Sequence, residues 1–145
     1  MKFEDTSKPL SDEEIRDFEK KARVKLPEAF KRHYITYNGG YPVDAEAVEG
    51  IEHTFPLHGF FPLTHGSLTI ESVKKDLAED FGLTDAIPFA YDQGSNIFYI
   101  STSEANFGAV FQITAETRDR FWLLKALRIS WKVCGRYSRA CYALF

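Results

Sequence analysis

The chain of 145 residues has few cysteines and no long apolar run. Only Cys134 and Cys141 are present, too few for the disulfide framework of a small secreted domain. No apolar stretch approaches the roughly 20 residues needed to cross a bilayer, so we expect no membrane association. The first residues, Met1 to Thr6, lack the apolar core of a secretory signal. Together these absences predict a protein of the reducing cytoplasm.

The sequence also lacks the signatures of common active sites. It contains no Gly-x-Ser-x-Gly motif and no Cys/His nucleophile pattern. The glycines of Asn38-Gly39-Gly40 follow a predicted helix, whereas a phosphate-binding loop precedes one. Adjacent carboxylates such as Glu79 and Asp80 do not face each other on a helix. We therefore predict a protein without catalytic residues and without a cofactor.

The metal-binding potential of the sequence is low. The four histidines are His33, His53, His58 and His65. A zinc site needs converging ligands at short characteristic spacings, which these histidines lack, so we predict no metal site. The alternative is a small metal-dependent hydrolase that uses the histidines at 53–65. The two cysteines lie seven residues apart, about 10.5 Å along a continuous helix, which favours free thiols. A bridge across a helix break at Gly135 is the alternative.

The net charge of −3 conceals two oppositely charged segments. Residues 1–113 carry 11 basic and 19 acidic side chains, a balance of −8. Residues 114–145 carry 7 basic and 2 acidic side chains, a balance of +5, and they hold both tryptophans and both cysteines. The acidic majority argues against direct nucleic-acid binding, which needs a basic surface to meet phosphates.

A helix is predicted after a loose lead-in of residues 1–10. Ser11 suits the N-cap position, and Glu14, three residues later, completes a capping box. Leu10 and Ile15 occupy the two positions of a hydrophobic staple around that cap. These signals place the helix start at the end of the lead-in.

A second helix is predicted to begin at Pro27, because a proline at the first helical position loses no hydrogen bond. Phe30, Tyr34 and Tyr37 follow at helical spacing and share one face. Asn38-Gly39-Gly40 ends the helix, since glycine adopts the left-handed conformation that terminates helices.

The rest of the chain up to residue 114 is predicted to be mostly β-structure. Residues 41–70 are β-rich and irregular. Between His53 and Phe61, Pro56 and Gly59 restrict any strand to a sheet edge or a bulge. A helix over 70–81 follows from its apolar periodicity. An antiparallel meander is expected from strands at 86–91, 96–101 and 108–114. Gly94 is expected to supply a positive φ in the first turn of this meander. Helices first and strands later predict an α+β domain.

Two segments of the chain carry a resemblance to a known family. From Leu26 to Gly40 a Leu-Pro helix ends in Asn-Gly-Gly, and from Ile87 to Ile100 an Ile-Pro-Phe-Ala strand leads through an acidic, glycine-containing turn into a hydrophobic strand. In order and spacing over residues 11–114, this pattern resembles the SUKH superfamily. That superfamily contains fungal regulators of cell-wall (glucan) synthesis and many bacterial toxin-immunity proteins.

The resemblance implies a single α+β domain over residues 11–145, with a central, mostly antiparallel sheet flanked by helices. It also implies a non-catalytic, cytosolic protein-binding module. The bacterial members suggest an immunity protein that neutralises a secreted polymorphic toxin, of nuclease or deaminase type, by stoichiometric binding. The fungal members suggest the alternative, a regulatory scaffold of cell-wall synthesis.

The last 31 residues, 115–145, depart from the family pattern. Members usually finish with an acidic helix, whereas this segment is basic. A helical stripe is still expected there, formed by Phe121, Leu124, Leu127 (or Arg128), Trp131 and Cys134. We predict an atypical basic C-terminal helix. The alternative is a divergent or frameshifted terminus.

An acidic run follows the second predicted helix, with no basic residue among residues 41–52. Its members are Asp44, Glu46, Glu49 and Glu52. One interpretation is a solvated loop or edge strand, where charge discourages aggregation. The other is a docking surface for a basic toxin, with neighbouring Tyr41 and Phe55 as aromatic anchors. We predict that these six residues bind the partner, and that the protein itself is a monomer or a weak homodimer.

Overall fold

The computed structural model describes residues 2–43, 45–49, 54–124, 129–132 and 140–144. Within these residues, three α-helices and two main sheets make up an α+β domain, as predicted. The helices are α1 (Asp12–Ala22), α2 (Glu28–Thr36) and α3 (Ile70–Phe81). The strands are β1 (Phe3–Glu4), β2 (Tyr41–Pro42), β3 (Ala45–Glu49), β4 (Thr54–Pro56), β5 (Gly59–Phe60), β6 (Ala86–Tyr91), β7 (Ile97–Ser101), β8 (Val110–Ile113), β9 (Arg120–Leu124), β10 (Ile129–Lys132) and β11 (Ala140–Leu144).

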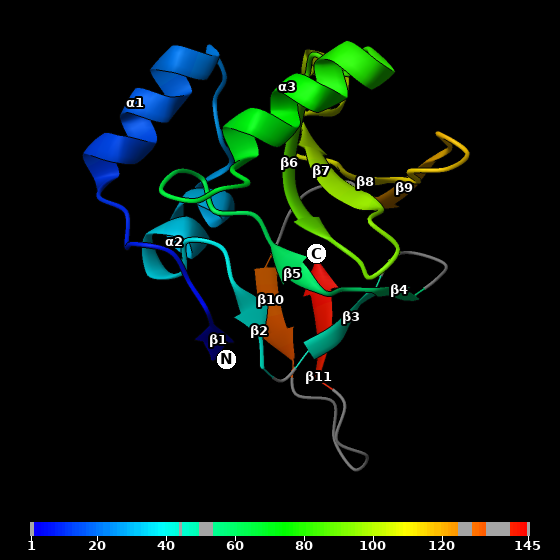
Figure 1. The fold of residues 1–145 in the computed structure, drawn as a ribbon, viewed down its shortest axis with the longest axis horizontal. Helices are drawn as coiled ribbons and strands as arrows, with labels where there is room; N and C mark the ends of the chain where they lie inside the picture. Colours follow the sequence, from blue (N-terminus) through cyan, green and yellow to red (C-terminus); the bar gives the residue numbers. More distant parts are fainter. Residues whose placement is uncertain (1, 44, 50–53, 125–128, 133–139, 145) are drawn as a thin grey trace.

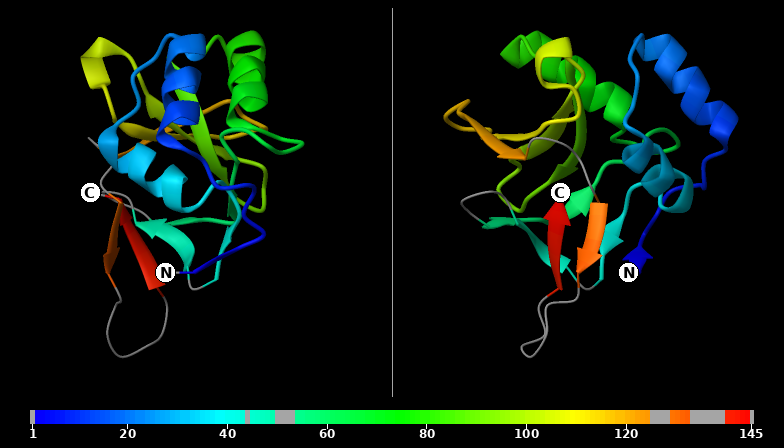
Figure 2. Two further views of the ribbon diagram at one scale, coloured as in Figure 1. Left: turned by 90° about the vertical axis from the view of Figure 1, so that its left-hand side faces the viewer. Right: turned by 180° about the vertical axis from the view of Figure 1, so that it is seen from behind.

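The larger sheet is fully antiparallel, in the order β5-β6-β7-β8-β9. The predicted meander forms its centre, where Tyr99 of β7 pairs with Phe111 of β8. The smaller sheet, β10-β11-β3-β4, contains one parallel pair, β11 with β3. Both β4 and β5 lie at sheet edges, which confirms the restriction expected from Pro56 and Gly59. The views in Figure 1 and Figure 2 place the helices towards one end of the molecule and β10 and β11 towards the other.

Helix α1 starts where the capping box predicts. The Ser11 Oγ accepts the Glu14 amide, and the Glu14 carboxylate accepts the Ser11 amide. Leu10 and Ile15, the two residues of the staple, are both buried. These contacts satisfy amide groups that a helix start otherwise leaves unpaired, so local sequence alone fixes this boundary.

Helix α2 differs slightly from its prediction. Pro27 is the N-cap residue, and the helix ends at Thr36 with Tyr37 extended. Phe30 and Tyr34 are each 1 % exposed, which confirms the buried face. The two glycines at 39 and 40 both have positive φ, two to three positions later than a terminating glycine would stand.

Helix α3 has the predicted bounds and joins two parts of the core. Thr69 and Ser72 form a capping box at its start, and Gly82 adopts the left-handed conformation at its end. Ile70 and Val73 belong to the main apolar cluster. Leu77 packs in a second cluster, against the opposite face of the larger sheet.

The turn between β6 and β7 uses a different residue from the one predicted. Ser95, with φ 62°, takes the left-handed conformation, and Gly94 does not. Asp92 stabilises this turn, since its Oδ1 accepts the amides of Gly94 (2.8 Å) and Asn96 (2.9 Å).

The first ten residues are not the loose lead-in that we expected. Strand β1 pairs antiparallel with β2, and Phe3 matches Pro42 in that pairing. The Phe3 ring stacks on Tyr37 with centroids 4.6 Å apart, and meets Phe60 edge-on at 5.4 Å. These contacts join Phe3 to rings that are distant in sequence, so nothing local predicts them.

The predicted C-terminal helix is wrong for the residues that the structure describes, because they form β9, β10 and β11. Strand β9 extends the meander by pairing with β8, with Leu123 fully buried and Trp122 55 % exposed. Strand β11 pairs with β3, which is distant in sequence. In this segment, pairing with the edges of existing strands prevails over an apolar spacing that is also compatible with a helix. Of the expected stripe, Leu127, Arg128 and Cys134 lie outside the described residues.

Candidate functional site

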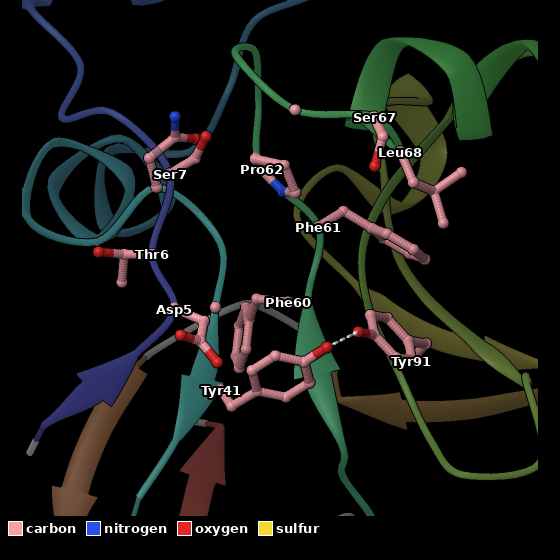
Figure 3. Close-up of a pocket in the computed structure, with 13 residues that line it drawn as sticks. Asp5, Thr6, Ser7, Tyr41, Phe60, Phe61, Pro62, Ser67, Leu68 and Tyr91 are labelled. Atoms are coloured by element: carbon pink, nitrogen blue, oxygen red, sulfur yellow. Dashed lines mark hydrogen bonds between the residues drawn. The ribbon is translucent and has the colours of Figure 1, made fainter.

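A surface hollow lies where the start of the chain, β2, β5 and the segment after β5 meet (Figure 3). Its volume is about 580 Å³. Aromatic and small polar residues line it: Asp5, Thr6, Ser7, Asn38, Gly40, Tyr41, Phe60, Phe61, Pro62, Gly66, Ser67, Leu68 and Tyr91. The volume of this hollow lies within the range of ligand pockets, and polar and apolar groups share its lining.

Asn38 joins the segments that surround this hollow. It is 1 % exposed, and its Nδ2 donates to the carbonyls of Lys8 (2.8 Å) and Thr64 (3.0 Å). Its Oδ1 accepts the amide of Leu63 at 2.8 Å. Gly39 is confined as well, since a Cβ there would lie 2.6 Å from the Pro62 nitrogen. The Asn-Gly motif therefore holds two distant loops together, in addition to following a helix.

Tyr41, His58 and Tyr91 form an aromatic cluster, and its two tyrosines line the hollow. The Tyr91 hydroxyl donates to the Tyr41 hydroxyl at 3.5 Å, and the His58 ring meets both tyrosine rings edge-on. Tyr41 is 40 % exposed. Burial and the Tyr41 hydroxyl raise the pKa of Tyr91 to about 12, so its phenol stays neutral at physiological pH.

Gly59 makes room for this cluster. A Cβ at that position would lie 2.8 Å from the Tyr91 hydroxyl and 3.2 Å from the Tyr41 ring. Both are closer than ordinary van der Waals contact, so any side chain would displace the Tyr91 ring. Gly59 disfavours a regular strand at β5, but the absence of a side chain there allows Tyr41 and Tyr91 to contact each other.

The loop that forms one wall of the hollow is tied to helix α1. His65 Nε2 lies 2.6 Å from Glu14 Oε1, and the Ser7 hydroxyl donates to the His65 carbonyl. The Ser11 amide and His65 together hold the pKa of Glu14 at about 2. The carboxylate is therefore ionised near neutral pH, and the capping residue of α1 also anchors the loop.

The described lining of the hollow carries one formal charge, which is negative. Among its described lining residues, Asp5 is the one with a formal charge. Asp5 has φ 51° and is exposed. Figure 3 shows its carboxylate near the end of β1. This site therefore favours cationic over anionic groups.

The predicted partner-binding residues are distributed unevenly. Tyr41 lines the hollow, as stated above. Phe55 is partly buried against the main core. Glu46 and Glu49 belong to β3, which lies between β11 and β4. Asp44 and Glu52 lie outside the described residues. The role of all six in partner binding stays a prediction.

A second hollow, of about 510 Å³, lies beyond the end of α3. Three aromatic rings cross its floor on neighbouring strands: Tyr99 and Phe111 stack at 5.3 Å, and Phe111 and Trp122 stack at 6.2 Å. Asp85 and Arg120 give it one charge of each sign. We did not predict this hollow, because its aromatic row depends on the β8–β9 pairing, where a helix was expected.

The three described histidines lie in different surroundings. His33 is buried among aromatic rings, where burial lowers its pKa to about 4. His58 belongs to the aromatic cluster, and His65 pairs with Glu14. His53 lies outside the described residues. Within the described part of the chain, no three His, Cys, Asp or Glu side chains gather as a metal site would require. The described helices also include none long and apolar enough to span a membrane.

The helices and the antiparallel meander define the class of protein, an α+β domain. The chain belongs to the SMI1 / KNR4 family (SUKH-1), whose sequence profile matches residues 9–127. This match confirms the resemblance found in the sequence. Neither the curated proteins nor the solved structures include a match to the chain.

Proposed function

We propose that this protein is a non-catalytic binding module that neutralises a toxin protein with a basic surface, acting in the cytoplasm as an immunity protein. Membership of the SUKH-1 family supports the proposal at the level of the family. The observation that carries it is the hollow with its exposed tyrosine and its single described charge, the Asp5 carboxylate. Such a surface is suited to protein contact, because exposed aromatic groups dominate interface energetics.

The charge of the family region supports a basic partner. Residues 9–127 carry 12 basic and 19 acidic side chains, a balance of −7. A field of this sign steers a basic protein towards the domain and raises the association rate by orders of magnitude at low salt. Nucleases present basic grooves to their substrates, so an acidic inhibitor competes for the same surface. One monomer would cover roughly 800 Å² of such a toxin and block its substrate.

The decisive experiment uses the gene beside the one that encodes this chain. Its product is co-expressed with the chain, and the two are purified together and sized. We expect a 1:1 complex, and we expect co-expression to restore growth that the toxin alone arrests. A neighbouring product that is not toxic, or that does not bind, contradicts the proposal. Binding to a cell-wall synthesis protein would favour the scaffold alternative instead.

Two matched variants locate the interface. Tyr41→Ala removes an exposed aromatic ring at the hollow, and Phe107→Ala removes one of similar exposure elsewhere, 47 % against 40 %. Truncation of a central aromatic anchor typically costs about 2 kcal/mol or more, a roughly thirtyfold weaker complex. We expect this loss for Tyr41→Ala and almost none for Phe107→Ala. Equal effects would place the interface away from the hollow.

A further inference from the structure

The hollow beside Tyr41 combines aromatic walls with a carboxylate. Tyr41, Tyr91 and the buried Phe60 and Phe61 belong to its lining, and Asp5 contributes the charge. The faces of aromatic rings are negative and attract cations, most strongly guanidinium groups. Within the described lining, therefore, both the rings and the one charged group favour a positive ligand.

The remaining polar groups of the lining also suit a hydrogen-bond donor. The Tyr41 and Tyr91 hydroxyl oxygens lie 3.5 Å apart, and each has acceptor capacity left after their mutual hydrogen bond. Because the pKa of Tyr91 is raised to about 12, this phenol neither ionises nor changes character near neutral pH. Arginine donates from five N–H groups in a fixed plane and no group of it accepts, so it matches a pocket of acceptors and ring faces.

Two glycines pack closely against residues that line the hollow. A Cβ on Gly66 would lie 2.7 Å from Pro62 Cγ, and a Cβ on Gly59 would lie 2.8 Å from the Tyr91 hydroxyl. Neither position tolerates a side chain without moving a wall of the hollow. A volume of about 580 Å³ leaves room for a long side chain together with part of the segment that bears it.

We propose that this hollow receives an arginine side chain of the bound partner. The inference rests on the proposed function in one respect, that the arginine belongs to a toxin. The binding of an arginine side chain in the hollow depends on this chain alone. The guanidinium stacks against the tyrosine rings and pairs with the Asp5 carboxylate, while its stem covers the apolar wall near Leu68.

The test uses a short peptide in place of the toxin. Acetyl-Gly-Arg-Gly-amide is titrated into the full chain, and the amide signals of Gly40, Gly59 and Gly66 are followed by NMR. A matched peptide with citrulline keeps the shape of arginine and removes its charge, and a lysine peptide keeps the charge and removes the planar group. We expect a millimolar dissociation constant for the arginine peptide, and binding about tenfold weaker for the citrulline peptide. The lysine peptide should fall between them.

Asp5→Asn provides the matching change in the protein. Asparagine adopts the left-handed conformation at least as readily as aspartate, so the φ of 51° is preserved while the charge is lost. We expect about threefold weaker binding of the arginine peptide, since this carboxylate is exposed and partly screened. Phe107→Ala, away from the hollow, should leave the dissociation constant unchanged.

Several results would overturn the inference. These are citrulline or lysine peptides that bind as well as arginine, signal changes confined to the hollow at Tyr99, or no change at about 30 mM peptide. Because the peptide experiment contains no toxin, its failure leaves the co-purification result intact. Arginine binding without any toxin complex would instead preserve the pocket and refute the immunity function.

Discussion

Replacement of Asn38 by alanine should destabilise the protein more than any other polar-to-alanine change at the hollow. The side chain makes three hydrogen bonds, to the Lys8 carbonyl, the Thr64 carbonyl and the Leu63 amide. All three partners are backbone groups, and Leu63 itself is fully buried. Alanine leaves each of them without this partner, so the cost reflects both the lost bonds and the unpaired groups.

The magnitude follows from the number of bonds. Each hydrogen bond contributes about 1 kcal/mol net, so the three together contribute about 3 kcal/mol. Water entering the adjacent hollow can reach the two part-buried carbonyls more readily than the buried Leu63 amide, which sets a range of about 2–4 kcal/mol. For a chain of this length, the midpoint of thermal unfolding should fall by about 9 °C.

Urea unfolding followed by far-UV circular dichroism measures the free energy directly. Asn106→Ala is the matched control, because the only side-chain hydrogen bond described for Asn106 is with Ser101. We expect about 1 kcal/mol for this control. A loss below 1 kcal/mol for Asn38→Ala, or one equal to the control, would refute the assignment of Asn38 as the residue that joins the two loops.

Three further predictions concern charge. The pKa of Glu14 is lowered from 4.5 to about 2, so its ionised carboxylate stabilises the fold above pH 4.5 and loses this effect as the pH falls towards 2. Glu14→Gln lacks the carboxylate, so the urea midpoints of wild type and variant should converge between pH 4.5 and pH 2. NMR titration should place the pKa of His33 near 4, and because the unfolded chain takes up its proton near 6.5, stability should fall as pH drops from 6.5 to 4. Reversal of Glu46 and Glu49 to lysine should slow association with a basic partner and flatten its salt dependence; unchanged stopped-flow rates would remove β3 from the interface.

Local signals in the sequence were sufficient to predict an element wherever that element makes its own backbone hydrogen bonds or pairs with its neighbour in sequence. The capping box of Ser11 and Glu14 fixed the start of α1, and apolar spacing fixed α3 as a whole. The same holds for the strands of the meander, whose short connections leave antiparallel pairing with the neighbour as the simplest arrangement. Family membership was also readable, because its motifs fall within these elements.

Long-range pairing defeated the same reasoning at both ends of the chain. Apolar spacing near Phe121 and Trp131 is compatible with a helix, but both residues lie in strands. Phe121 is in β9, which pairs with β8, and Trp131 is in β10, which pairs with β11, itself paired with β3. Phe3 likewise finds its place only against rings from α2 and β5. The apolar periodicity of a segment shows which of its residues share a face, but it does not show which strand edge elsewhere in the chain is available for pairing.

The sequence by itself determined the class of fold, the three helices, the meander and the acidic character of the family region. Only the tertiary structure decided where a partner could be held. Asn38 looked like part of a helix stop, yet its side chain reaches two loops that are distant in sequence. The hollow draws Asp5, Tyr41 and Tyr91 from three separate segments. Such a site exists only when packing brings those segments together, so no local pattern of residues predicts it.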